Sequence, residues 1–225
     1  MPVPSYRGST YVGYLDISGF KQMMENKRKA TSVLDKFYRT LHGAIYEVNS
    51  TSPSNVKMNV IAVSDCAVLF LSEENNYDVG EILGLPKMLQ FVRYVNCRFI
   101  TNDFPFMTTC SISYGDFGYE DRNEREYVRK NCIYGTAYVN SFLDSRLEQP
   151  KLKPGECRLL KKGLTVDFRE HEAFSLLGSR RGYFYYYWML KDAGEKKKFR
   201  RKLKQTSEEL YTPMIELLQK SIGEF

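Results

Sequence analysis

Residues 11–20 read YVGYLDISGF and decide how the fold begins. Tyr11–Leu15 is a run of β-forming residues, which predicts a short strand. The strand ends at Asp16 and continues into a turn that contains Gly19. Apolar residues then recur at helical spacing from Phe20 onward. The segment therefore predicts a strand that leads directly into a helix.

A second apolar segment, residues 56–71, reads VKMNVIAVSDCAVLFL. Its two β-rich runs, Val56–Val63 and Ala67–Leu71, are separated by only three residues. Such a short separation predicts a tight hairpin, and it places Asp65 at the tip.

The remaining segments alternate between strand and helix patterns. The helical stretch after Phe20 is long and is expected to break between Asn26 and Thr31. Further along we expect helices over 78–97, 136–148 and 194–222, strands over 108–114, 131–134, 155–166 and 182–190, and a turn over 115–118. The order lacks the regular βαβ spacing of a doubly wound sheet. It predicts an α+β fold with a mainly antiparallel sheet and helices on one face.

The composition is that of a globular protein, with 225 residues of which 43% are hydrophobic and 27% charged. No apolar run approaches the roughly 20 residues that span a bilayer. The N-terminus has no basic segment followed by an apolar one, so no secretory signal is expected. Five scattered cysteines without a CxxC pair, and only two histidines, argue against a zinc site and a disulfide framework. We therefore expect a reduced, cytoplasmic protein.

Positive charge is concentrated in one segment. Residues 191–204 hold eight basic and two acidic residues, and the rest of the chain holds 25 of each sign. A solvated helix face explains such a run; an anionic membrane surface or a nucleic acid is the alternative. Phe199 is the one aromatic residue in the run, which is poor support for base stacking. We expect no stable nucleic-acid or membrane partner.

Asp16 and Asp65 are the candidate metal ligands. If their strands are neighbours, both carboxylates lie at one edge of the sheet, and with the carbonyl of Ile17 they suit Mg²⁺ or Mn²⁺. Two such ions would activate a hydroxyl and hold a pyrophosphate leaving group. The amides that open the following helix form a candidate phosphate-binding turn: Ile17, Ser18, Gly19 and Phe20. The alternative is structural, with Asp16 as a helix cap and Asp65 as a turn residue.

Four segments, in this order, resemble the catalytic domain of class III nucleotidyl cyclases. YLDISGF (14–20) resembles the first metal-binding signature of that family, and VSDCAVLF (63–70) resembles the second. SISYGDFGY (111–119) and YGTAYVNSFLDSRLE (134–148) are similar to the hairpin and helix that follow. The resemblance implies a ferredoxin-like βαββαβ catalytic domain over residues 1–190 and a basic helical extension over 191–225. It also implies two divalent ions and a homodimer with sites at the interface.

The positions that read the base differ from those of purine cyclases. Purine cyclases have Lys or Glu four residues before the second metal aspartate, where this chain has Ile61. The second base-reading position falls on Cys132 or Ile133. A site built for a polar base edge would leave buried groups unpaired after losing those residues. Together with the GxAYV pattern at 135–139, the chain resembles the pyrimidine cyclases of the bacterial Pycsar antiphage system. That resemblance implies conversion of UTP, in preference to CTP, into a cyclic nucleotide that a separate effector reads.

The family also places an Asn and an Arg one turn apart on a helix, facing the partner subunit's active site. Asn140 is present, but four residues later the chain has Asp144, and Arg146 faces elsewhere on a regular helix. RRG at 180–182 occupies the place of a family Lys-Gly, so Arg181 or Arg180 is a candidate phosphate ligand. The candidate catalytic residues are thus Asn140, Arg146 and Arg181. A helix cap and a surface ion pair are the alternative for the first two.

Two other functions remain open from the sequence. A purine cyclase with an unusual base pocket would run the same reaction, and Ile61 argues against it. A catalytically inactive domain would bind only a nucleotide or a partner, and the presence of both aspartates argues against that. VSDCAVLF lacks the Gly-Gly-(Asp/Glu)-Glu-Phe hairpin of a diguanylate cyclase.

Overall fold

The structure, a computed structural model, describes residues 3–51, 55–73, 77–101, 105–125, 128–168, 174–206 and 211–222, with only the backbone described over 121–131. Its elements follow the expected alternation of strands and helices. In chain order they are β1 (Tyr6–Ile17), α1 (Phe20–Met23), α2 (Lys27–Thr51), β2 (Val56–Val63), β3 (Cys66–Glu73), α3 (Glu81–Ile100), β4 (Thr108–Arg125), β5 (Val128–Tyr134), α4 (Thr136–Ser145), β6 (Cys157–Leu160), β7 (Leu177–Arg180), β8 (Tyr183–Tyr186), the 3₁₀ turn η3 (Ala193–Glu195), α5 (Lys196–Gln205) and α6 (Tyr211–Ser221).

One sheet joins all the strands, in the order β2-β3-β1-β4-β6-β8-β7, with β5 paired to β4. Every pairing is antiparallel except that of β4 with β6, which is parallel. The predicted α+β class with a mainly antiparallel sheet is therefore confirmed. β1 lies in the middle, between β3 and β4, although β2 and β3 follow it in the chain.

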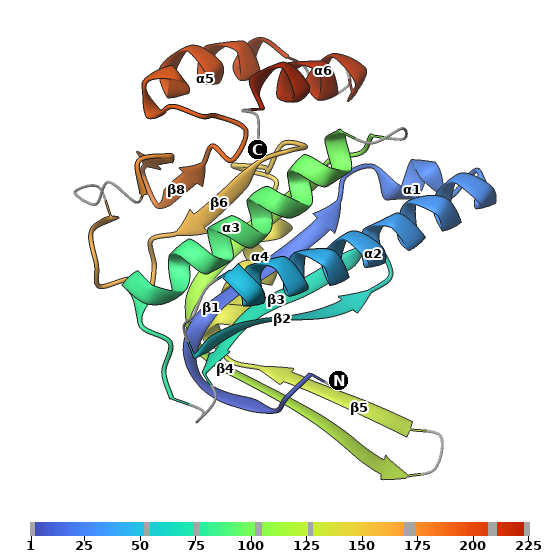
Figure 1. Ribbon diagram of the computed structural model, residues 1–225, viewed down its shortest axis with the longest axis vertical. Helices are drawn as coiled ribbons and strands as arrows, with labels where there is room; N and C mark the ends of the chain where they lie inside the picture. The colour runs from blue at the N-terminus through green and yellow to red at the C-terminus, as the bar shows by residue number, and fades with distance from the viewer. Residues whose placement is uncertain are drawn as a thin grey trace.

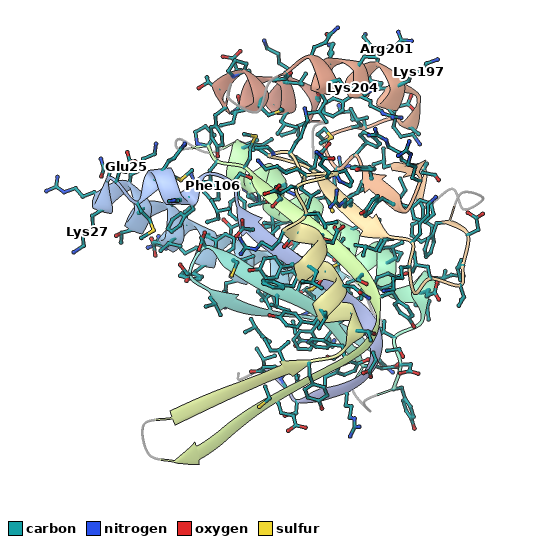
Figure 2. All side chains as sticks on the ribbon, turned by 180° about the vertical axis from the view of Figure 1, so that it is seen from behind. Glu25, Lys27, Phe106, Lys197, Arg201 and Lys204 are labelled. Atoms are coloured by element: carbon teal, nitrogen blue, oxygen red, sulfur yellow. The ribbon has the colours of Figure 1, made fainter. Side chains whose placement is uncertain are left out.

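The two faces of the sheet carry separate hydrophobic cores. Side chains alternate along β1: Tyr11 and Leu15 enter a large core that holds α2 and α3, whereas Val12 and Tyr14 enter a small core with residues of α4. Figure 1 shows α2 and α3 on the near face, and Figure 2 shows α4 on the opposite one. The expectation of helices on one face was wrong, because the apolar positions of α4 need a surface of their own.

The predicted turn over 115–118 is also wrong, since β4 continues through it. Residues 115–119 pair with the first half of β1, in a register that runs from Thr10↔Gly115 to Tyr6↔Tyr119. Gly115 has a φ of 152°, where a Cβ would lie 2.9 Å from Thr136 Oγ1. The glycine thus allows α4 to approach the strand. The hairpin closes further along, and β4 and β5 project as an arm from the body (Figure 1).

The C-terminal part differs from expectation in its details. The strand expected over 155–166 is only the four residues of β6, the one expected over 182–190 is only β8, and β7 was not predicted. The helix expected over 194–222 is divided into η3, α5 and α6, with residues 207–210 outside the description. Phe199 and Leu203 of α5, with Met214 of α6, belong to the large core, so these helices are packed on the sheet.

Candidate active site

Asp16 and Asp65 lie side by side at one end of the sheet. Asp16 is the penultimate residue of β1 and pairs with Cys66, the first residue of β3. Asp65 occupies the turn between β2 and β3, and its carbonyl accepts a hydrogen bond from the Ile17 amide at 3.0 Å. The predicted hairpin with Asp65 at its tip is confirmed, and so is the neighbourhood of the two strands.

The two carboxylates interact electrostatically. Burial and the charge of Asp65 raise the pKa of Asp16 from 3.8 to about 6, and the Arg146 guanidinium partly opposes this rise. Asp16 follows Val12 and Tyr14 along the same face of β1, the face that α4 covers. A half-buried carboxylate beside a second one is a place where bound positive charge is strongly favoured.

The donor set fits a divalent cation with hard oxygen ligands. Two carboxylates would be completed by a backbone carbonyl, such as that of Ile17, by water, or by the oxygens of a bound phosphate. Within the described ranges no group of three or more His, Cys, Asp or Glu side chains is placed so that it could hold a metal ion. An ion between Asp16 and Asp65 would therefore have only these two carboxylates as side-chain ligands of those types and would need backbone, water or phosphate oxygens besides.

The predicted phosphate-binding turn is smaller than expected. Gly19 has a φ of 75°, and α1 after it is a single turn of four residues. Of the four candidate amides, that of Ile17 already donates to Asp65, and that of Ser18 donates to Met107 O at 2.9 Å. The amides of Gly19 and Phe20 are left as candidate phosphate donors. A Cβ placed on Gly19 would meet nothing within 4 Å, so the turn is open on that side.

Arg146 lies near Asp16 of its own chain. It follows the last residue of α4, so the helical spacing used to orient it does not apply. Its guanidinium lies 5.9 Å from the ring centroid of Tyr14 and 5.7 Å from that of Phe142, and it donates to the Tyr14 hydroxyl at 3.4 Å. Arg146 and Asn140 thus have different neighbours, in agreement with the expectation that they face different directions, but the position of Arg146 near Asp16 was not predicted. The chain ends its helix early and directs this cation toward Asp16.

Asp144, which takes the place of the expected arginine, has a structural partner. Its carboxylate accepts hydrogen bonds from Arg158 Nε at 2.7 Å and Nη2 at 2.9 Å, and from Ser111 Oγ at 2.5 Å. Arg158 is fully buried and also donates from Nη1 to the Pro150 carbonyl at 2.7 Å. This buried ion pair joins the end of α4 to β6.

Asn140 and Arg181 lie apart from the aspartates. Asn140 Oδ1 accepts a long hydrogen bond of 3.5 Å from Lys162 Nζ. Arg181 is exposed in the turn between β7 and β8, with a φ of 39°. Across the described part of the chain, no hydrogen bond or ion pair connects either residue to Asp16 or Asp65. Any role at the aspartates would need a second subunit.

The two expected base-reading positions differ in exposure. Ile61 on β2 is buried in the small core with Val68 and Phe70. Cys132 on β5 is half-buried opposite Glu120, and its neighbour Ile133 packs against the small core. Neither position offers a charged group to a base.

Sequence reasoning missed three residues that shape this site: Tyr14, Cys66 and Arg158. Tyr14 was detectable, because it precedes Asp16 by two residues on the same strand face. Cys66 lies beside both aspartates, and burial raises the pKa of its thiol, with the charges of Asp16 and Asp65 acting in the same direction. No local signal marked Arg158, because its partner is fourteen residues away in another element.

Solved structures with a similar fold are nucleotide cyclase domains. A double mutant of the guanylyl cyclase domain of the RhoGC fusion protein from the aquatic fungus Blastocladiella emersonii has a TM-score of 0.57 at 10% identity, covering 83% of this chain and 97% of that one. The guanylate cyclase domain of RhGC from Catenaria anguillulae, solved in complex with GTP, has a TM-score of 0.53 at 14% identity, covering 81% and 96%. The adenylyl cyclase CyaB from P. aeruginosa has a TM-score of 0.50 at 14% identity, covering 82% and 95%.

At these identities the comparison shows the fold, which is that of a cyclase catalytic domain. The chain matches no protein-family model, and no curated protein is similar to it in sequence. Among the described helices, none combines the length and the apolar character that a bilayer crossing requires.

Proposed function

We propose that this chain is a nucleotide cyclase that converts UTP, in preference to CTP, into the 3′,5′-cyclic monophosphate and pyrophosphate. The observation that carries the proposal is the convergence of Asp16 and Asp65 beside the Gly19 turn, within a cyclase fold. The catalytic domain spans residues 1–190, and residues 191–225 form an extension of it.

Asp16 and Asp65 would hold two Mg²⁺ or Mn²⁺ ions. Such ions, when bound, neutralise phosphate charge and lower the pKa of the ribose 3′-hydroxyl. The amides of Gly19 and Phe20 orient the triphosphate, and Arg146 supplies a fixed positive charge next to Asp16. The 3′-oxygen attacks the α-phosphorus in line, the hydroxyl proton goes to solvent, and pyrophosphate leaves. The protein contributes positioning and charge, and it needs no nucleophile of its own.

The preference for a pyrimidine rests on Ile61. A buried aliphatic side chain in place of a charged one cannot pair with the polar edge of a purine. The resemblance to antiphage pyrimidine cyclases extends the proposal to a signalling role, in which a separate effector reads the cyclic product.

A homodimer is part of the proposal, supported by the outer side of α4. Val139 and Leu143 are 47% and 56% exposed and lie one turn apart on α4, so they form an apolar stripe, and Leu147, just past the end of the helix, is 41% exposed. Tyr134, just before the helix, is 38% exposed. A second copy covering this stripe would bring Asn140 toward a neighbouring site, which a single chain does not do.

A purine cyclase with an atypical pocket is the second candidate, favoured by the guanylyl and adenylyl cyclases among the similar structures. An inactive nucleotide-binding domain is the third. One assay separates all three: the full chain is incubated with Mn²⁺ and each of the four ribonucleoside triphosphates, and products are identified by mass. Cyclic UMP supports the proposal, cyclic AMP or GMP supports the second candidate, and no product with any nucleotide supports the third.

Matched variants connect the product to the site. Asp65→Ala is expected to abolish the product while the chain stays folded, because Asp65 lies in a turn and is only half-buried. Asp35→Ala is the control, since Asp35 forms only an exposed ion pair with Arg39 on α2. Equal activity of the Asp65→Ala and Asp35→Ala variants would contradict the metal assignment. The defence role is tested by phage plating on cells that carry the intact or the Asp65→Ala chain with its native neighbouring genes.

A further inference from the structure

A pocket lies between α5 and the ends of the last strands of the sheet. Its walls are the turn before β6, the strand β7, the end of β8 and one side of α5. Figure 1 shows α5 extending across this end of the sheet, beyond β6 and β8. None of the residues that line it belongs to the site formed by Asp16 and Asp65.

Four cations and one carboxylate line this pocket. The cations come from three segments: Lys153, Arg180, Arg200 and Lys204. The carboxylate, Glu156, accepts a hydrogen bond from the Lys153 amide at 2.9 Å. Within the described ranges, none of the four cations forms an ion pair with a carboxylate. Glu156 offsets part of this charge, since its interactions with Lys153 and Arg180 oppose the rise that burial causes in its pKa, and the described lining residues keep a net positive charge.

Aromatic side chains form the rest of the lining. The Arg180 guanidinium lies 6.0 Å from the centroid of the Tyr185 ring, and Tyr187 packs edge-on against Phe199 with centroids 6.2 Å apart. Burial raises the pKa of Tyr187; the charge of Glu156 adds to the rise, and the charges of Arg200 and Arg180 act against it, so all three groups lie near this hydroxyl. Flat rings beside guanidinium groups are a suitable environment for an aromatic anion.

The size of the pocket limits its ligand. The centres of water molecules have about 110 Å³ available. At about 10–15 Å³ per molecule this is room for roughly seven to eleven waters, or about 210–330 Å³ of liquid. That volume matches one ring, one sugar and one phosphate.

We propose that this pocket binds a small phosphorylated molecule with an aromatic ring, of the nucleoside monophosphate class. The phosphate pairs with the guanidinium and ammonium groups, and the ring packs against the tyrosines and Phe199. Because Phe199 and Leu203 of α5 line the pocket, the ligand contacts the extension and the sheet at once. The proposal does not depend on the cyclase activity proposed above.

The test is calorimetric titration of the full chain, carrying Asp16→Asn and Asp65→Asn, in buffer with EDTA so that the metal site does not contribute. The probes are uridine 5′-monophosphate, inorganic phosphate and uridine. We expect one UMP per chain, weaker binding of phosphate, and no detectable binding of uridine. Adding R200E and K204E is expected to weaken UMP binding by about tenfold or more, since charged hydrogen bonds are lost.

The matched control adds K197E and R201E, which make the same change in net charge on the same helix. Both residues are exposed, lie four apart and line no part of the pocket; Figure 2 labels them along α5 together with Lys204. We expect less than a twofold change in UMP affinity for this variant. Equal losses of UMP affinity in the two variants would overturn the proposal and would assign the positive charge to a diffuse basic surface. Binding of anionic phosphatidylserine vesicles, if both variants lose it equally, would have the same meaning. Failure of both UMP and phosphate to bind at millimolar concentration would also overturn it. If the R200E and K204E variant unfolds at a lower temperature, R180Q, at the exposed end of β7, replaces it with the same expectation.

Discussion

Replacing Asp16 by Asn is expected to stabilise the metal-free protein while removing one of the two proposed metal ligands. In the folded chain, burial and Asp65 raise the pKa of Asp16 from 3.8 to about 6. A raised pKa means that folding favours the protonated form, so stability is greatest at low pH and is lost as the pH rises through about 6. An asparagine has no charge to bury at any pH, and it therefore avoids this loss.

The magnitude follows from the same pKa. One pKa unit is worth about 1.4 kcal/mol, so a rise from 3.8 to about 6 sets a limit of about 3 kcal/mol. Asp16 is only half-buried, and solvent screens its charge. We therefore expect Asp16→Asn to raise the free energy of unfolding by about 1–2 kcal/mol at pH 7.5 in EDTA. The gain should shrink as the pH is lowered toward 4, where the aspartate is already protonated.

Urea denaturation at pH 7.5 and pH 4.5 measures this difference directly. Asp65→Asn is the internal control: it removes only the second cause of the raised pKa, so its gain should be smaller. Addition of Mn²⁺ should reverse the order, since it stabilises the wild-type chain by mass action and has little effect on the Asp16→Asn variant. The reasoning is refuted if Asp16→Asn is less stable than wild type at pH 7.5 without metal, or if its gain is the same at both pH values.

Three further predictions concern neighbouring groups. Asp144→Ala should lower the free energy of unfolding by about 3–5 kcal/mol, because Arg158 is left buried without its partner. Replacing Asp144 by Leu and Arg158 by Met should lower it much less, as measured by chemical denaturation. An equal loss of stability in the two variants would contradict the argument. Arg146→Gln should raise the pKa of Asp16 further, since it removes the positive charge that lowers this pKa. If NMR titration of the Asp16 carboxyl group shows a lower pKa in the variant, the placement of Arg146 is contradicted. Gly135→Ala should destabilise the chain markedly, because the alanine Cβ would lie 2.3 Å from the Asp116 carbonyl oxygen. If the variant unfolds at the same temperature as the wild type, the contact between β4 and α4 is not as close as described.

Much of the site could be predicted from local sequence. A β-rich run that ends in Asp16, and a three-residue separation that leaves Asp65 in a turn, are patterns of a few residues each. Each is set by propensity and turn chemistry, which act within one element. Bringing Asp16 and Asp65 together required the assumption that β1 and β3 are neighbouring strands, and the register Asp16↔Cys66 confirms that they are.

The course of β4 could not be predicted in the same way. Gly115 and Gly118 are residues typical of a turn, yet β1 pairs with the chain through both positions. Hydrogen bonds to a strand about a hundred residues earlier in the sequence outweigh the local turn preference, and no pattern within the segment reports that partner.

Arg146 and Asp144 show the same limit within the site itself. The sequence alone determined that Asp16 ends a strand, that Asp65 lies in a turn between two strands, and that a cation lies near the end of a helix. The tertiary structure decided that the helix ends at Ser145, which directs Arg146 toward Asp16, and that Asp144 is paired with Arg158. Short-range propensities depend on neighbouring residues in the sequence, whereas the partner of a buried charge depends on which distant element packs against it.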